Sequence, residues 1–343
     1  MSTLTDFTSV PVVDVAGLRR GDPAERTRVA RELGRAAREV GFLYVTGTGV
    51  DPALFDELLR VTKAFFALPL EVKMQTWIGR STNHRGYVPV GEEVFAGGTV
   101  DQKEAYDLGL DLLPDDPDYL AGRMLGPNQW PELPGFAAAC TAWYDAVLAL
   151  GRDLLHGFAV ALGEPPDAFD AFVSKPPSQL RLLHYPHDPA VRDAVGAGAH
   201  TDYECFTLLR PTAPGLEVLN AAGTWVDVPP LPGAFVVNVG DVLETWTNGQ
   251  FVATTHRVRR VAQERWSFPL FFNVDHDTVV APLAQFVDGN GPARRPLVAG
   301  DHLFAQTAQS FTYLRARIAS GDLVLPDGSL GLASFGQRER TTP

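Results

Sequence analysis

The sequence predicts a β-rich fold, either a sandwich or a barrel, with flanking α-helices. From residue 178 onward, short runs rich in β-branched and aromatic residues follow one another, separated by turn residues at intervals of roughly ten, as in all-β folds. The 343 residues include 32 glycines and 27 prolines, and so many turn formers favour a β-rich body over a helical bundle. The predicted strands are QLRLLHYP, CFTLLRP, LEVLN, TWVDVP, GAFVVNVGD, ATTHRVRRV and RWSFPLFFNV.

The first half of the chain predicts helices between short strands. Residues 9–16 are expected to form a short strand, and 41–46 (GFLYVT) a buried one. Residues 23–40 have Pro23 at the start and apolar residues at helical spacing, which predicts an amphipathic helix. Residues 52–67 predict a second one.

Three further segments complete the predicted layout. Residues 80–135, rich in Gly, Pro and Asp, predict a mostly irregular stretch covering a binding site, with 80–110 as a lid. Residues 135–163 carry one broad apolar stripe and predict the longest helix, packed on the outside of a sheet. A closing helix is expected at 301–319.

We expect a single domain, 1–343, with three regions. These are a helix-rich N-terminal region and lid (1–175), a β-core that holds the functional site (176–290), and a C-terminal helix and tail (291–343).

Composition narrows the function. The net charge is −12 and no basic stripe is present, so a nucleic-acid partner is not expected. We find neither a signal peptide nor an apolar run of bilayer length, and we expect no membrane partner and a cytoplasmic protein. Cys140 and Cys205 are placed as buried thiols of a reducing compartment. The oligomeric state is open, and the sequence is compatible with a monomer.

The segment Ala-His-Thr-Asp-Tyr suggests a metal site. In a strand, residues two apart share a face, so His200 and Asp202 would point the same way. His256 lies several predicted strands later, and closure of the sheet could bring it back as a third ligand. Two histidines and one carboxylate that leave three positions open suit the iron(II) of an oxygenase. The alternatives are a surface H-x-D pair and a hydrogen-bonded core histidine.

Arg265 and Ser267 suggest an anion receptor beside that metal. They stand two apart in a predicted strand and would project into the same interior, where an arginine is costly unless it meets an anion. Guanidinium and hydroxyl together suit a carboxylate. Together with the metal ligands they fit 2-oxoglutarate, and Tyr185 could donate a further hydrogen bond. The alternative for Arg265 is a salt bridge to an internal acidic residue.

With these residues in place, the sequence resembles the isopenicillin N synthase-like branch of the iron(II)/2-oxoglutarate oxygenases. The matching segments run from about residue 10 to 275: VPVVDVAGL, GFLYVTGTGV, RGYVPVGEE, LRLLHYP, GAHTDYECFTLL, GDVLETWTNGQFVATTHRV and ERWSFPLFF. The resemblance implies a double-stranded β-helix (jelly-roll) core and iron at His200, Asp202 and His256. It also implies that Arg265 and Ser267 form the R-x-S pair that receives the co-substrate carboxylate.

The chain departs from that family at two places. Gly47-Thr48-Gly49 stands where Gly-His-Gly is common, far from the iron ligands. His184 replaces a common Asn before Tyr-Pro, beside the expected co-substrate pocket. In addition, RGYVPVGEEVFAGG and Tyr203 resemble the bacterial ethylene-forming enzyme, too locally to transfer its activity. A dinucleotide-binding interpretation of Gly47-Thr48-Gly49 fails because Pro52 occupies the place of the third glycine.

Four residues are candidates for substrate contacts: Arg85, Arg181, Tyr203 and Glu92. Arg181 shares a predicted strand face with Leu183 and Tyr185 and would approach the same cavity. For both arginines a structural ion pair is an equal alternative. For Glu92 and its neighbour Glu93 the alternative is a solvated loop.

The expected activity is that of an Fe(II)/2-oxoglutarate-dependent dioxygenase, with O2 as the second co-substrate. It would oxidise a small amino-acid-derived or natural-product substrate and release succinate and CO2, with hydroxylation as the default and desaturation or cyclisation as variants. No catalytic residue beyond the metal ligands is expected. The alternatives are an isopenicillin N synthase-type oxidase without 2-oxoglutarate, an ethylene-forming-type enzyme, a non-catalytic binding protein, and a zinc hydrolase.

Overall fold

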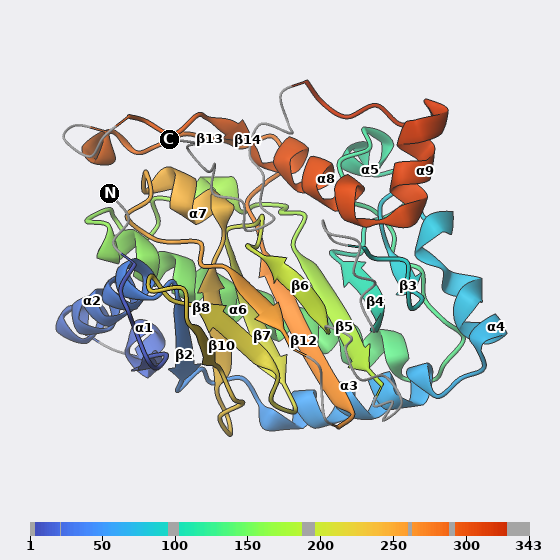
Figure 1. Ribbon diagram of the computed structural model, residues 1–343, viewed down its shortest axis with the longest axis horizontal. Helices are drawn as coiled ribbons and strands as arrows, with labels where there is room; N and C mark the ends of the chain where they lie inside the picture. Colours follow the sequence, from blue (N-terminus) through green and yellow to red (C-terminus); the bar gives the residue numbers. More distant parts are fainter. Residues whose placement is uncertain are drawn as a thin grey trace.

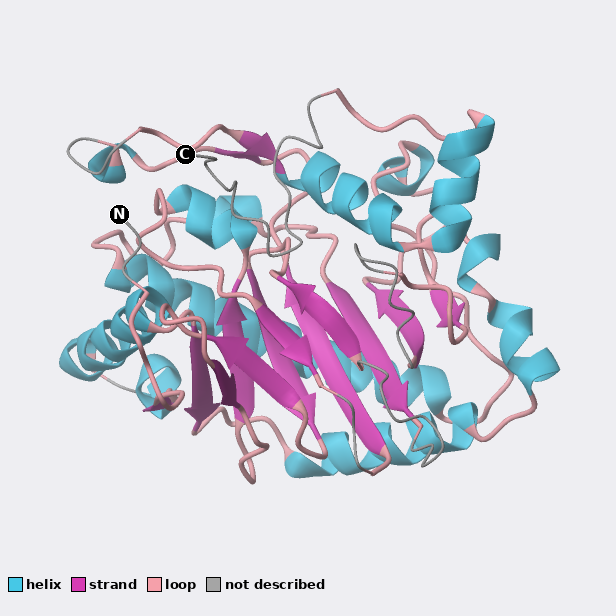
Figure 2. Ribbon diagram, viewed as in Figure 1, coloured by secondary structure: helices cyan, strands magenta, loops and turns pink. Residues whose placement is uncertain are grey.

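The computed structural model describes residues 4–20, 22–94, 103–186, 196–259, 263–287 and 292–327. At its centre are two β-sheets with helices around them (Figures 1 and 2). The strands are β1 Val12–Asp14, β2 Phe42–Thr46, β3 Gly86–Val88, β4 Glu104–Gly109, β5 Gln179–Tyr185, β6 Ala197–His200, β7 Phe206–Pro211, β8 Leu216–Leu219, β9 Trp225–Asp227, β10 Phe235–Val239, β11 His256–Val258, β12 Arg265–Phe272, β13 Val279–Val280 and β14 Leu297–Val298. The α-helices are α1 Ala16–Arg20, α2 Pro23–Glu39, α3 Pro52–Phe66, α4 Leu70–Lys73, α5 Pro117–Leu120, α6 Phe136–Ala161, α7 Asp241–Trp246, α8 Ala299–Ser310 and α9 Thr312–Ser320.

The larger sheet has eight strands in the order β1-β2-β10-β7-β12-β5-β4-β3, and the smaller has four in the order β6-β11-β8-β9. Neighbouring strands in these two sheets pair antiparallel except β1 with β2, which are parallel. Apolar residues of both sheets share one cluster, in which Tyr44 and Val236 of the larger sheet pack with Val218 of the smaller. The predicted β-rich fold with flanking helices is confirmed.

Side chains alternate along the central strands as a period of two requires. On β12, Phe268 and Leu270 enter the main apolar core, whereas Arg265 and Ser267 line a cavity on the opposite face. The larger sheet therefore has one face against helices and one face against the cavity, and both faces are buried.

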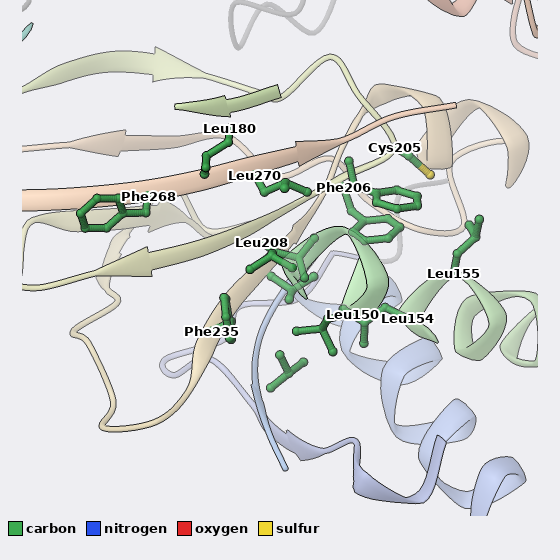
Figure 3. Close-up of a cluster of buried hydrophobic side chains, with 14 of the residues drawn as sticks. Leu150, Leu154, Leu155, Leu180, Cys205, Phe206, Leu208, Phe235, Phe268 and Leu270 are labelled. Atoms are coloured by element: carbon green, nitrogen blue, oxygen red, sulfur yellow. The ribbon is translucent and has the colours of Figure 1, made fainter. Parts of the chain in front are cut away.

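Helices α2, α3 and α6 cover the core face, and their starts follow from the sequence. Asp22 and Asp51 accept backbone hydrogen bonds at the first turns of α2 and α3, and a proline follows each of them. Figure 3 shows Leu150 and Leu154 of α6 in one cluster with side chains of the larger sheet, among them Phe206 of β7. The predicted packing of this helix on the outside of the sheet is confirmed.

The stretch 80–135 is more regular than predicted, because it contains β3, β4 and α5. Strand β4 lies between β5 and the edge strand β3 and pairs with both. Its sequence, EAYDLG, does not indicate a strand, because two of its six residues are acidic. Both acidic residues are nevertheless buried in ion pairs, Glu104 with Lys73 at 2.7 Å and Asp107 with Arg181 at 2.7 Å. Of the expected lid at 80–110, residues 95–102 lie outside the described residues.

The closing helix expected at 301–319 is two helices, α8 and α9, which lie over one end of the strands (Figure 1). The helix breaks at Phe311, whose backbone is extended (φ −95°, ψ 130°). Glu92 holds the start of α9, since its carbonyl oxygen accepts from the Thr312 N–H at 2.9 Å and its carboxylate from the Tyr313 N–H at 2.9 Å. Residues 328–343 of the expected tail lie outside the described residues.

Strands from the N-terminal region share the larger sheet with β5, β7, β10 and β12. The larger sheet therefore crosses the expected boundary near residue 175, and the single domain at 1–343 stays a prediction. Among the described residues, none of the helices combines the length and the apolar character needed to cross a bilayer. Cys140 and Cys205 are both buried free thiols.

Candidate active site

The structure brings the three predicted metal ligands together. His200 and His256 are directly opposite each other in the β6–β11 pair, with ring centroids 4.4 Å apart. The Oδ1 atom of Asp202 lies 3.6 Å from the Nε2 atom of His200 and 3.5 Å from the Nε2 atom of His256. All three ligand atoms lie within 4.8 Å of one another, so a single ion could contact them all.

Hydrogen bonds orient each ligand. The Nδ1 atoms of His200 and His256 lie 2.8 Å and 3.1 Å from the carbonyl oxygens of Gly198 and Thr254. A carbonyl oxygen only accepts, so each Nδ1 carries the proton and each Nε2 offers its lone pair to a metal.

Asp202 is held through its other oxygen. Its Oδ2 accepts from the Asn238 amide at 2.7 Å and from the Thr207 hydroxyl, which leaves Oδ1 toward the histidines. Strand β6 ends at His200, so Asp202 lies in the following turn and not in the strand that the sequence predicted. The turn, anchored by the Asp241 N–H on the Asp202 carbonyl at 2.9 Å, brings the carboxylate to the histidines.

Electrostatics suit a divalent cation here. Burial, with a smaller effect of the nearby His200, lowers the pKa of His256 to about 4, so the imidazole is neutral at pH 7. Burial alone would raise the pKa of Asp202, but the two histidines and the hydrogen bonds from Asn238 and Thr207 lower it overall. Two imidazoles and one carboxylate form the donor set that iron(II) oxygenases use.

Arg265 is 1% exposed and lines the same cavity as Ser267 and Tyr185. Its Nε donates to the Ala213 carbonyl at 3.1 Å, and its Cζ lies 4.8 Å from the centre of the Tyr185 ring. Its Nη1 is buried and has no hydrogen-bond partner in the described part of the chain, where no acidic residue pairs with it either. An unpaired buried guanidinium nitrogen requires an anion.

The four substrate candidates separate into two groups. Arg181 and Tyr203 line the cavity, whereas Arg85 and Glu92 are not among the described residues that line it. The Arg181 guanidinium is bound by Asp107 at 2.7 Å and 2.8 Å and by Glu93 at 3.1 Å. Arg181 therefore both forms the structural ion pair given as an alternative and lines the cavity.

Arg85 and Glu92 have structural positions. Arg85 is buried and donates to the carbonyl oxygens of His84 at 3.0 Å and Met124 at 2.9 Å, which ties its loop together. Glu92 faces the start of α9, and Glu93 lines the cavity in its place. Neither glutamate is on a solvated loop, because both are less than 10% exposed.

His184, the departure expected to disturb the co-substrate pocket, faces the other side of the sheet. Its ring stacks on Trp266 at a centroid distance of 4.0 Å, and its Nδ1 lies 2.8 Å from a Glu104 carboxylate oxygen. Leu183 and Tyr185, its neighbours in β5, line the cavity. Alternation along the strand therefore keeps His184 out of the pocket.

Sequence reasoning missed several residues of this site. Asn238 was one that could have been found, because an amide inside the apolar run FVVNV must be hydrogen-bonded when buried. Lys103 and Glu204 also line the cavity, but charged residues in loops and edge strands carry no periodic signal.

Comparisons with known proteins agree with this geometry. Residues 10–133 match the family model of the N-terminal region of non-haem dioxygenases in morphine synthesis, and residues 176–274 match that of the 2OG-Fe(II) oxygenase superfamily. A rice (Oryza sativa subsp. japonica) protein named homoarginine-6-hydroxylase is 33% identical over 325 residues, covering 90% of this chain and 99% of the rice protein. The 2-oxoglutarate-Fe(II) type oxidoreductase hxnY of Emericella nidulans is 32% identical over 317 residues, covering 89% and 91% of the two chains.

Solved structures with the jelly-roll core are also similar. A full-length Neurospora crassa protein, crystallised in complex with alpha-KG and thymine, aligns with a TM-score of 0.75 and 26% identity, over 94% of this chain and 100% of the other. A 2OG-Fe(II) oxygenase family protein from Caulobacter crescentus aligns with a TM-score of 0.77 and 32% identity, over 92% and 99% of the two chains. The predicted jelly-roll core is thereby confirmed.

Proposed function

The chain belongs to the 2OG-Fe(II) oxygenase superfamily, and from that premise we propose how its residues serve the reaction. The protein is an Fe(II)/2-oxoglutarate-dependent dioxygenase that oxidises a small molecule and releases succinate and CO2. The roles of individual residues, the branch of the family and the substrate class make up the proposal.

His200, Asp202 and His256 hold the ferrous ion. The observation that carries this assignment is the convergence of three ligand atoms whose free lone pairs face one another, with each opposite atom already hydrogen-bonded. The bound ion, together with 2-oxoglutarate, supplies the activation of O2 that oxidises a substrate C–H bond.

Arg265, Ser267 and Tyr185 receive the far carboxylate of 2-oxoglutarate. The unpartnered Nη1 of Arg265 and the neighbouring hydroxyl of Ser267 would each donate to one carboxylate, and the Tyr185 hydroxyl would add a third donor. Apolar side chains that line the same cavity, such as Leu209 and Val258, would keep water from the space that the co-substrate carbon chain occupies.

Arg181 and Tyr203, which line the same cavity, position the substrate. Two carboxylates already hold the Arg181 guanidinium in place, so it would lose little side-chain entropy when it contacts the substrate. Hydroxylation of an amino-acid-derived or natural-product molecule is the proposed outcome, with desaturation or cyclisation depending on where the substrate carbon lies. The names of the relatives, which refer to homoarginine and thymine, support a small nitrogen-containing substrate.

We further assign the chain to the isopenicillin N synthase-like branch, on the ordered motifs from residue 10 to 275. The two buried free cysteines support the expected cytoplasmic location.

Two measurements test the proposal. Anaerobic addition of Fe(II) and 2-oxoglutarate should give a weak visible charge-transfer band in the wild type, and the His200→Ala variant should not give it. Under O2, turnover of a substrate should release one succinate per product. Substrate oxidation without succinate would identify an oxidase of the isopenicillin N synthase kind, and ethylene in the headspace would identify an ethylene-forming-type enzyme.

A further inference from the structure

Glu204 is a buried carboxylate of the cavity for which the functions assigned so far have no use. It is 5% exposed and lines the cavity two residues after Asp202. Its Oε2 atom is buried and has no hydrogen-bond partner in the part of the chain that the structure describes. A buried carboxylate oxygen without a donor is costly, so its position requires an explanation.

The backbone around Glu204 is fixed beside the metal ligands. The Asp241 N–H donates to the Asp202 carbonyl at 2.9 Å, and the Val242 N–H donates to the Glu204 carbonyl at 3.1 Å. The first turn of α7 therefore holds the ligand Asp202 and the carboxylate Glu204 on one short loop. Glu204 and the three proposed metal ligands line one cavity, so a group bound by Glu204 would share that cavity with the ferrous ion.

The cations that line this cavity are directed to other carboxylates. Arg181 pairs with Asp107 at 2.7 Å and with Glu93 at 3.1 Å, and Lys103 pairs with Glu93 at 3.1 Å. Among the described residues, no ion pair links an arginine, a lysine or a histidine to Glu204. These two cations are therefore directed to Glu93 and Asp107, and neither of them pairs with Glu204.

We infer that Glu204 is a specificity-determining residue that binds a positively charged nitrogen group of the substrate, an ammonium, amidinium or guanidinium. An N–H of that group would donate to Oε2 and supply the missing hydrogen bond, and its positive charge would favour the ionised form of the Glu204 carboxyl group. This inference rests on the proposed function, because it places the cation beside the carbon that the iron centre oxidises. It narrows the substrate class from a small molecule to a cationic one.

The test measures binding to the anaerobic holoenzyme with Fe(II) and 2-oxoglutarate, by calorimetry and by the change in the charge-transfer band. The probes are matched in shape: L-homoarginine against L-homocitrulline and Nα-acetyl-L-homoarginine, butylguanidine against butylurea, and thymine as a neutral ring. Homocitrulline lacks only the guanidinium charge, the acetylated probe lacks only the α-ammonium charge, and butylurea is neutral. We expect a probe that keeps the cationic group bound by Glu204 to bind at least roughly tenfold more tightly than the counterpart that lacks this group. Glu204→Gln, which keeps the shape and removes the charge, should abolish that preference.

The controls separate this inference from the proposed function. Glu217, on β8, pairs with Arg257 and is not among the described residues that line the cavity. The Glu217→Gln variant should therefore retain the preference for cationic probes. The band with Fe(II) and 2-oxoglutarate must persist in Glu204→Gln, which shows that the metal site is intact. If the band forms but no cationic probe binds, or a neutral probe binds more tightly, or Glu204→Gln leaves the preference unchanged, the inference is wrong. Loss of the band in the wild type would instead overturn the proposed function.

Discussion

Backbone carbonyl oxygens fix which ring nitrogen carries the proton in the two histidines of the proposed metal centre. Because Gly198 and Thr254 each accept from an Nδ1–H, neither imidazole has to reorient when a metal binds. Asp202 is fixed in the same way through its second oxygen. A site with this degree of preorganisation should depend strongly on each ligand.

His256→Ala should abolish turnover, because it leaves two ligands for an ion that needs three from the protein. The measurement is the iron content after anaerobic loading, together with succinate release. His156→Ala, which removes a surface histidine paired with Asp170, is the matched control and should bind iron normally. Full iron occupancy and turnover in His256→Ala would contradict the ligand assignment.

Arg265→Ala should raise the KM for 2-oxoglutarate by at least roughly tenfold, because a buried charge-assisted contact to the carboxylate is lost. Initial rates of succinate formation at varied 2-oxoglutarate concentrations measure this effect. Arg257→Ala removes an arginine that pairs with Glu217 on the smaller sheet and should leave the KM unchanged. An unaltered KM in Arg265→Ala would show that the carboxylate binds elsewhere.

His84 should make the stability of the metal-free protein depend on pH. Burial lowers its pKa in the folded state to about 3, below the ordinary value of 6.5, so the unfolded chain takes up a proton first as the pH falls. Its contribution to stability is therefore present above pH 6.5 and is lost as the pH falls toward 3. Between pH 7 and pH 5 the wild type should lose about 2 kcal/mol more of its unfolding free energy than His84→Asn.

Urea unfolding at the two pH values measures this difference, in which contributions from other groups cancel. Asn is the suitable replacement because residue 84 has a positive φ of 61°, which Asn tolerates. Equal losses in the two proteins would mean that His84 is protonated in the fold.

At the scale of single elements, long periodic helices were predicted well and polar strands were not. The helices at 23–40, 52–67 and 135–163 begin and end within two residues of α2, α3 and α6, because capping Asp-Pro pairs and apolar stripes are local signals. Strand β4 was missed because its buried acidic residues have distant partners. The break between α8 and α9 was missed for the same reason, since Glu92 holds it from 220 residues away.

Glu92→Gln should lower the unfolding free energy by about 0.5–2 kcal/mol, as loss of a capping carboxylate does. Because Phe311 and Ser310 beside this cap line the cavity, the KM for the substrate should rise while the KM for 2-oxoglutarate stays unchanged. Denaturant unfolding and steady-state kinetics measure the two effects. Glu32→Gln, which breaks an exposed pair with Arg28 on α2, should change both far less.

At the scale of the whole molecule, the candidate site was predicted from residue types and strand alternation. The sequence placed Arg265 and Ser267 on one strand face, and they line one cavity in the structure. It could not show which of Glu92 and Glu93 faces the cavity, because that depends on where α9 begins. Contacts made across the whole chain decide such questions, and a single sequence does not record them.

The two sheets divide the site between them. His200 and His256 belong to the smaller sheet and Arg265 to the larger, and an apolar cluster shared by both sheets sets the gap. A fixed separation between the proposed iron ligands and Arg265 would select dicarboxylic acids by their length. We expect oxaloacetate, which is one methylene shorter than 2-oxoglutarate, and 2-oxoadipate, which is one methylene longer, to fit this separation less well than 2-oxoglutarate. Replacing 2-oxoglutarate by either acid should reduce kcat/KM by at least roughly tenfold, and comparable rates with all three would mean that the sheets adjust their separation.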